Sequence, residues 1–145
     1  MERRTPNEIR QLVCEGRWQR KHLTAVQQQF GDDLLFDALF GAFADDAHGF
    51  QEQQRAGRYL IQLRPSCRLP LALAIRQSLP HWNLSIEELP FYFSKVFGRD
   101  AVSNTLAELE AEGGFTDLEL RAILTYRYWL RVDEQKMLSY EGLDS

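Results

Sequence analysis

The side chains best suited to metal chemistry in this chain are its histidines and a short run of acids. His22, His48 and His81 are isolated, because none lies three or four residues from another, the spacing that places two ligands on one helix face. Asp45 and Asp46 with His48 form the best local set. Acids and a histidine near helix ends are also expected from helix capping and the helix dipole. We therefore predict no metal site and no cofactor.

The candidate nucleophiles in this chain are its two cysteines, Cys14 and Cys67. Cys14 falls in the last turn of an expected helix, where the negative pole raises a thiol pKa. Cys67 lies between Arg64 and Arg68, ahead of Pro70, and a helix N-terminus pointing at it would favour its thiolate. A buried apolar role is commoner for a free cysteine, and we favour it. We predict no catalytic residue, because no phosphate loop, Gly-x-Ser-x-Gly or His-Glu-x-x-His motif occurs. An enzyme with scattered site residues remains a second alternative.

A run of arginines occupies the stretch between Glu52 and Glu87, which contains no acid. Forked guanidinium groups suit phosphate and carboxylate, so this run predicts an alternative function, the binding of phosphate or nucleic acid. The net charge of -4 disfavours nucleic acid. We favour a structural role, in which the arginines cover apolar surface and pair with the acids of residues 100–145. The members of the run are Arg55, Arg58, Arg64, Arg68 and Arg76, and Arg17, Arg20 and Lys21 could line the same groove if helix pairs stack.

The last expected helix carries a second candidate surface. A rotation of about 100° per residue places an apolar face toward the core, consisting of Leu118, Ala122, Ile123, Tyr126, Trp129 and Leu130. The opposite face consists of Arg121, Leu124, Arg127, Tyr128 and Arg131. Arginine and tyrosine are enriched at protein interfaces, so this face is the predicted partner-binding surface. The alternative is a packed helix whose arginines meet Glu108, Glu110 or Glu112.

Start and stop signals divide the chain into about eight short helices. Capping boxes are expected at Thr5–Glu8, Ser85–Glu88 and Thr116–Glu119, and Pro90 predicts a kink or a restart. Phe36, Phe40 and Phe43 form an aromatic stripe at helical spacing, which is typical of a core. No segment alternates as a strand does. The expected helices cover about 6–15, 18–30, 33–45, 51–63, 70–79, 85–97, 101–112 and 117–138.

These short helices predict an all-α protein. Short loops make neighbouring helices antiparallel, and helix pairs of roughly 30–40 residues favour a HEAT-like α-solenoid, with an irregular helical bundle as the alternative. The 145 residues, 44% hydrophobic, are expected to form one domain over 1–145, with a frayed end at 139–145.

Charge and hydropathy indicate the compartment and the partner class. Residues 1–24 carry six basic and three acidic groups (+3), whereas residues 100–145 carry four and ten (-6). No apolar run is long enough to span a bilayer, and the first residues do not resemble a signal peptide, so we expect a cytoplasmic protein without membrane contact. We predict a non-enzymatic protein–protein interaction module, an adaptor or a regulator.

Overall fold

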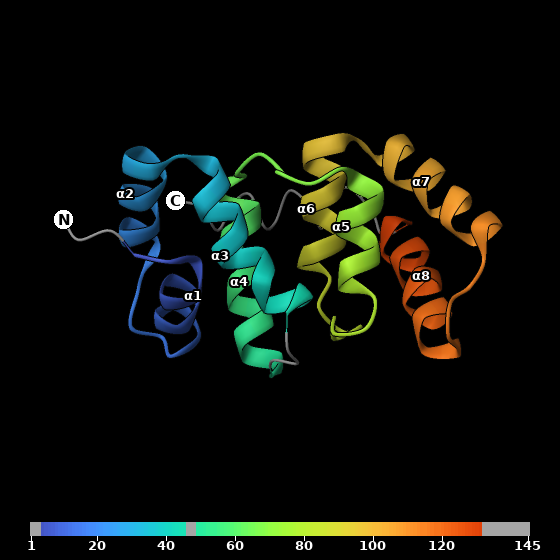
Figure 1. The fold of residues 1–145 in the computed structure, drawn as a ribbon, viewed down its shortest axis with the longest axis horizontal. Coiled ribbons are helices and arrows are strands. Elements are labelled where there is room, and N and C mark those ends of the chain that lie inside the picture. Colours follow the sequence, from blue (N-terminus) through green and yellow to red (C-terminus); the bar gives the residue numbers. More distant parts are fainter. Residues whose placement is uncertain (1–3, 46–48, 132–145) are drawn as a thin grey trace.

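The computed structural model describes residues 4–45 and 49–131, and within them it consists of helices and connections without strands (Figure 1). The prediction of an all-α fold is confirmed. The helices are α1 (Pro6–Cys14), α2 (Arg20–Phe30), α3 (Asp32–Ala44), α4 (Phe50–Leu63), α5 (Leu71–Ser78), α6 (Glu88–Phe97), α7 (Arg99–Glu112) and α8 (Asp117–Leu130).

The helices are arranged in two layers. In one layer α2 contacts α3, α3 contacts α5 and α5 contacts α7; in the other α1 contacts α4, α4 contacts α6 and α6 contacts α8. Contacts of α3 with α1 and α4, and of α7 with α6 and α8, join the layers. Figure 1 shows the row running from α1 and α2 at one end of the long axis to α7 and α8 at the other. Helix α8 is therefore a terminal element of its layer.

Aromatic side chains form the centre of the core, as the stripe in α3 predicts. Phe36 and Phe40 stack with ring centroids 4.9 Å apart, and both are buried. Phe40 also meets Phe93 of α6 edge to face. The ring centroids of Tyr126 in α8 and Trp82 lie 4.3 Å apart, so the last helix packs into the same core.

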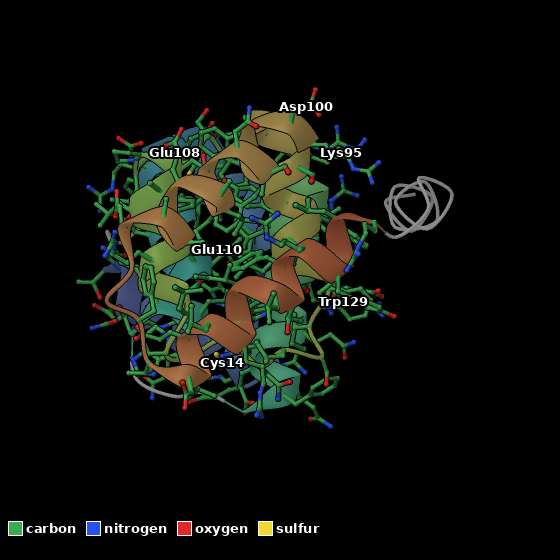
Figure 2. The ribbon with its side chains drawn as sticks, turned by 90° about the vertical axis from the view of Figure 1, so that its right-hand side faces the viewer. Cys14, Lys95, Asp100, Glu108, Glu110 and Trp129 are labelled. Carbon is green, nitrogen blue, oxygen red and sulfur yellow. The ribbon has the colours of Figure 1, made fainter. Side chains whose placement is uncertain are left out.

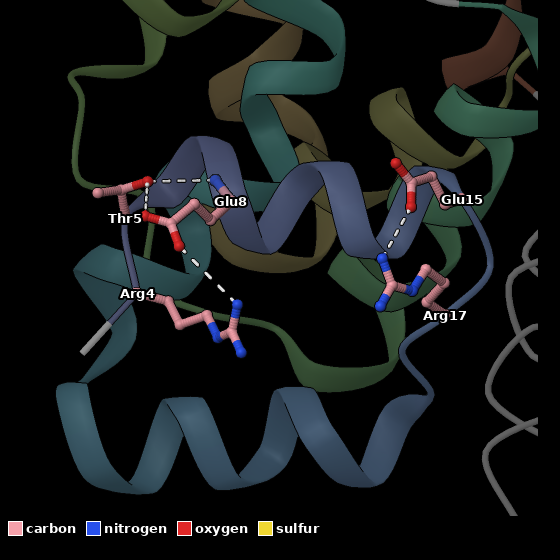
Figure 3. A network of polar contacts seen from close by, with 5 residues as sticks. All are labelled: Arg4, Thr5, Glu8, Glu15 and Arg17. Atoms are coloured by element: carbon pink, nitrogen blue, oxygen red, sulfur yellow. Dashed lines mark hydrogen bonds and ion pairs between the residues drawn. The ribbon is translucent and has the colours of Figure 1, made fainter. Parts of the chain in front are cut away.

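Helix caps account for several of the observed boundaries. The Thr5 hydroxyl accepts a hydrogen bond from the Glu8 amide at 3.2 Å, so Thr5 caps α1 (Figure 3). In the described chain the Glu8 carboxylate accepts from the Thr5 hydroxyl and not from the Thr5 amide, so the predicted capping box is only half formed. Thr116 and Glu119 form the full reciprocal capping box at the start of α8.

The expectation of a kink or a restart at Pro90 is wrong, because no helix runs into Pro90 from Ser85. Helix α6 begins at Glu88, so Pro90 is its third residue, where a backbone amide has no acceptor inside the helix and its loss is tolerated. Ser85 does not cap the helix; its amide donates to the side chain of Asn83 in the preceding turn.

The starts of α2, α3 and α7 also differ from expectation. Helix α2 begins at Arg20, where Gln19 and His22 form the cap, rather than at residue 18. Gly31 and Gly98 precede α3 and α7 with φ of 91° and 93°, conformations that favour glycine. The acids that follow them therefore lie inside the first turn and do not act as caps.

Candidate functional site

Helix α8 presents an exposed apolar surface. Six large hydrophobic side chains are exposed in the described chain, and four of them belong to α8. Leu124 is 61% exposed, Leu118 57%, Tyr128 56% and Leu120 40%. At about 100° per residue, Leu120, Leu124 and Tyr128 share one side of α8, whereas Leu118 lies apart from them.

The face predicted to bind a partner lies on the outside of the molecule. Leu124 and Tyr128 are well exposed, Arg121 and Arg131 are exposed, and Arg127 is half-buried. Figure 2 shows α7 and α8 together at the end of the molecule, facing the viewer. The five predicted residues are thus accessible, and their binding role remains a prediction.

The predicted inward face of α8 is correct except at its start. Ala122, Ile123, Tyr126 and Leu130 are buried, and Trp129 is half-buried with its indole N–H donating to the carbonyl of Leu84 at 3.0 Å. Leu118 is exposed instead of buried. At 100° per residue it lies about 80° from Tyr126, at the margin of the buried face.

The arginines of α8 differ in their partners. The guanidinium of Arg127 donates to the Glu110 carboxylate of α7 at 2.6 Å, so the predicted alternative of pairing with acids of that helix holds for this residue. Figure 2 labels Glu110 beside α8. Within residues 4–45 and 49–131, Arg121 and Arg131 have no ion-pair partner. Among the described residues, two of the three arginines on this face therefore lack a carboxylate partner.

A groove runs beside this face between α7 and α8. Its volume is about 470 Å³, and Leu124, Arg127 and Arg131 line it from α8, while Arg99, Asp100 and Ser103 line it from the start of α7. The groove widens the candidate surface beyond one helix.

Sequence analysis missed two residues of the exposed stripe, Asp117 and Leu120. With 3.6 residues per turn, Asp117, Leu120, Leu124, Tyr128 and Arg131 fall within an arc of about 80° on α8. Both missed residues are exposed. The same helical spacing could have revealed them, because Leu120 lies one turn before Leu124. We call these five residues the α8 stripe.

The arginine run does not form one surface. Arg64 ends α4 in a left-handed conformation and bonds the carbonyl of Ile61, while Arg68 pairs with Asp37 at 2.9 Å. Arg76 pairs with Glu112 at 2.5 Å. This pair joins the run to residues 100–145 as predicted, whereas the ion pairs of Arg58 and Arg68 in the described chain are made with Glu88 and Asp37.

Arg55 and Arg58 come together with Arg20 around a groove of about 660 Å³ on the outer face of α4. Arg55 donates to the carbonyls of Val13 and Cys14 at the end of α1, at 2.9 and 2.8 Å, and it has no carboxylate partner among the described residues. The other residues that line this groove are Gln51, Gln54, Tyr59 and Gln62, so the lining contains no acid in the described part of the chain. Arg58 lies 3.6 Å from the buried carboxylate of Glu88.

Neither cysteine lies in a setting that favours a thiolate. Burial raises the pKa of the Cys67 thiol, which donates to the Leu69 carbonyl at 3.3 Å. Burial also raises the pKa of Cys14, with the Glu52 charge as a second cause. Both are free thiols. An activated Cys67 is therefore not supported.

The candidate metal cluster is only partly described, since Asp46 and His48 lie outside the described residues. Asp45 forms an ion pair with Arg10 at 2.7 Å. No set of three potential metal ligands occurs in residues 4–45 and 49–131. In the same residues, no helix has the length and apolar character of a membrane span.

No protein-family model, curated protein or solved structure matches this chain at a significant level. The surfaces of α8 and α4 are therefore the basis for a functional proposal.

Proposed function

We propose that this protein is a non-enzymatic protein–protein interaction module, an adaptor or a regulator, that binds its partner through α8. The supporting observation is the concentration of exposed leucine and tyrosine on this helix. Tyrosine and arginine are enriched among the residues that contribute most to binding energy when a partner excludes water from them, and the leucines add apolar surface that a partner can cover.

The position of α8 supports the same proposal. We propose a HEAT-like arrangement for the two helix layers, in which each helix pair covers the next. The terminal unit of such a row needs a polar outer face to remain in water. The outer face of α8 instead presents Leu120, Leu124 and Tyr128, so a covering partner would remove apolar surface from solvent.

Capture of the partner with an α8 variant and a matched control tests the proposal. The tagged full chain is compared with Leu124→Glu/Tyr128→Ala and with Leu73→Glu, which introduces the same charge at an exposed leucine of α5. We expect the wild type and Leu73→Glu to retain the same protein through a high-salt wash, and the α8 variant to lose at least nine-tenths of it. Equal recovery by all three would contradict the proposal.

The α4 groove supports a second candidate function, the binding of a phosphate-bearing anion. Arg20 and Arg55 point to this chemistry, because the lining residues that the structure describes include forked donors and no acid. Calorimetric titration with pyrophosphate tests it: Arg20→Ala should weaken binding several-fold, while Lys21→Ala, a neighbouring charge outside the lining, should not. Binding insensitive to Arg20 and to salt would reject this candidate.

A cytoplasmic location is a proposal from the sequence, and cell fractionation tests it.

A further inference from the structure

We propose that the partner of α8 is the α8 of a second copy of this chain, bound antiparallel about a two-fold axis at Leu124. This inference rests on the proposed function, since it assumes that α8 is an interaction surface. It identifies the partner from the spacing and the charges of the α8 stripe.

The stripe has a symmetric spacing. Counting outward from Leu124, Leu120 and Tyr128 each lie four residues away, and Asp117 and Arg131 each lie seven residues away. In a two-fold antiparallel pair of helices, residues equidistant from the centre face each other. Leu124 would then face its own copy, each Leu120 would face a Tyr128, and each Asp117 would face an Arg131.

The charges at the two ends of the stripe suit this pairing. Asp117 and Arg131 are both exposed, and neither has an ion-pair partner within residues 4–45 and 49–131. A second copy would supply each with its opposite charge. A uniformly acidic helix from another protein would suit Arg131 but would place a like charge beside Asp117.

The arginines that flank the stripe do not oppose the pairing. Arg121 and Arg127 lie three residues on either side of Leu124, so they also face each other between copies. Arg127 already holds the carboxylate of Glu110 at 2.6 Å, and that pair is neutral overall. Arg121 of one copy therefore approaches a neutral ion pair of the other copy rather than an uncompensated guanidinium.

The α8 stripe is accessible to a second copy, and the interface between the two α8 helices would be small. In Figure 2, α7 and α8 lie in front at this end of the molecule. The groove beside Leu124, Arg127 and Arg131 leaves space for side chains of the second copy. Fourteen residues give a contact line of only about 21 Å. Such an interface is at the low end of the size range, so we expect a reversible dimer with a dissociation constant in the micromolar range.

Charge reversal at the two ends of the stripe provides the test, with sedimentation equilibrium of the purified full chain as the measurement. The wild type should approach twice the monomer mass with rising concentration. Asp117→Arg alone and Arg131→Asp alone each place like charges opposite one another, and each should weaken dimerisation at least ten-fold. The double variant Asp117→Arg/Arg131→Asp, and an equimolar mixture of the two single variants, should both restore it.

The control is Glu108→Arg, which reverses an exposed charge on α7 outside the stripe and should leave dimerisation unchanged (Figure 2). Circular dichroism of each variant checks that it is folded. A wild type that stays monomeric throughout the micromolar range would overturn this inference, while the capture experiment with Leu124→Glu/Tyr128→Ala would still decide the proposed function. A dimer equally strong in all the charge variants would also overturn it.

Discussion

Gln53 is a fully buried polar residue that joins three parts of the fold. Its amide nitrogen donates to the carbonyls of Ala42 and His81, at 3.1 and 2.8 Å. Its amide oxygen accepts from the backbone amide of Asn83 at 2.7 Å. One side chain of α4 therefore fixes the end of α3 and the connection before α6. The sequence places Gln53 on a helix but does not show which backbone groups it binds, because these are brought to it by the tertiary arrangement.

Replacement of Gln53 by alanine should be costly. The change leaves two carbonyls and one amide without their partner, and buried unsatisfied groups each cost about 1–3 kcal/mol. We expect a loss of roughly 2–4 kcal/mol in the free energy of unfolding, measured by urea denaturation. Gln77→Ala, at an exposed glutamine of α5, should change it by less than about 0.5 kcal/mol. Equal effects of the two substitutions would show that the buried bonds contribute little.

Asp32 links stability to pH. Its carboxylate accepts hydrogen bonds from the Ser66 amide at 2.9 Å and from Gln27 at 2.8 Å. These bonds, with the Ser66 amide as the largest cause, hold the pKa of Asp32 below its usual value. The ionised form is therefore favoured by folding, and its contribution is complete above the unfolded pKa of about 3.9.

Urea denaturation of wild type and Asp32→Asn across acidic pH checks this linkage. We expect the wild type to be the more stable of the two at pH values above about 5. The difference should shrink as the pH falls through the lowered pKa of Asp32 and the carboxylate is protonated. Asp33→Asn, an exposed neighbour in the same turn, is the control for removing a charge. A difference that grows on acidification would contradict this assignment.

At the scale of the elements, the sequence predicts the caps at Thr5 and Thr116, but it does not predict the absence of a Ser85 cap or how each helix face packs against its neighbours. Thr5, Thr116 and the aromatic stripe of α3 are local signals, and the structure confirms them. Pro90 could be read as a kink or as a first-turn residue, because the sequence does not show where α6 begins. Leu118 was misplaced for a related reason: helical periodicity gives the direction of a side chain, whereas its burial depends on what packs beside that turn.

The contact between α4 and α6 depends on a glycine. A Cβ added at Gly57 would lie 2.7 Å from the Cβ of Glu88 and 3.4 Å from the ring of Phe43. Gly57→Ala should therefore lower the free energy of unfolding by roughly 1–3 kcal/mol, although alanine is the better helix former. Thermal or urea denaturation measures the loss.

Gly41→Ala in α3 is the matched control for Gly57→Ala. A methyl group there would meet the guanidinium end of Arg10, which can move because it is the far end of a flexible side chain. We expect a much smaller loss at this position. A Gly57→Ala variant as stable as the wild type would mean that α4 and α6 can separate without penalty.

At the scale of the whole molecule, members of the arginine run form ion pairs with acids on several different helices. The arginine run meets Asp37, Glu88, Glu112 and backbone carbonyls, so its cations are spread over several helices. The sequence could not predict these partners, since they depend on which helices share a layer. It could predict the α8 face, because that face follows from helical spacing alone. It also grouped Arg20 with Arg55 and Arg58, but it could not separate them from Arg64, Arg68 and Arg76, since that separation depends on helix packing.

Hydroxyl-radical footprinting of Tyr128 tests most directly whether α8 is an interaction surface. Tyr128 is 56% exposed in the isolated chain, and half-buried Tyr59 on α4 is an internal reference. The labelling rates of both tyrosines are compared between dilute purified protein and the assembly captured from native lysate. We predict that assembly lowers the rate at Tyr128 several-fold and leaves Tyr59 unchanged. An unchanged rate at Tyr128 would contradict the assignment of α8 as the binding surface.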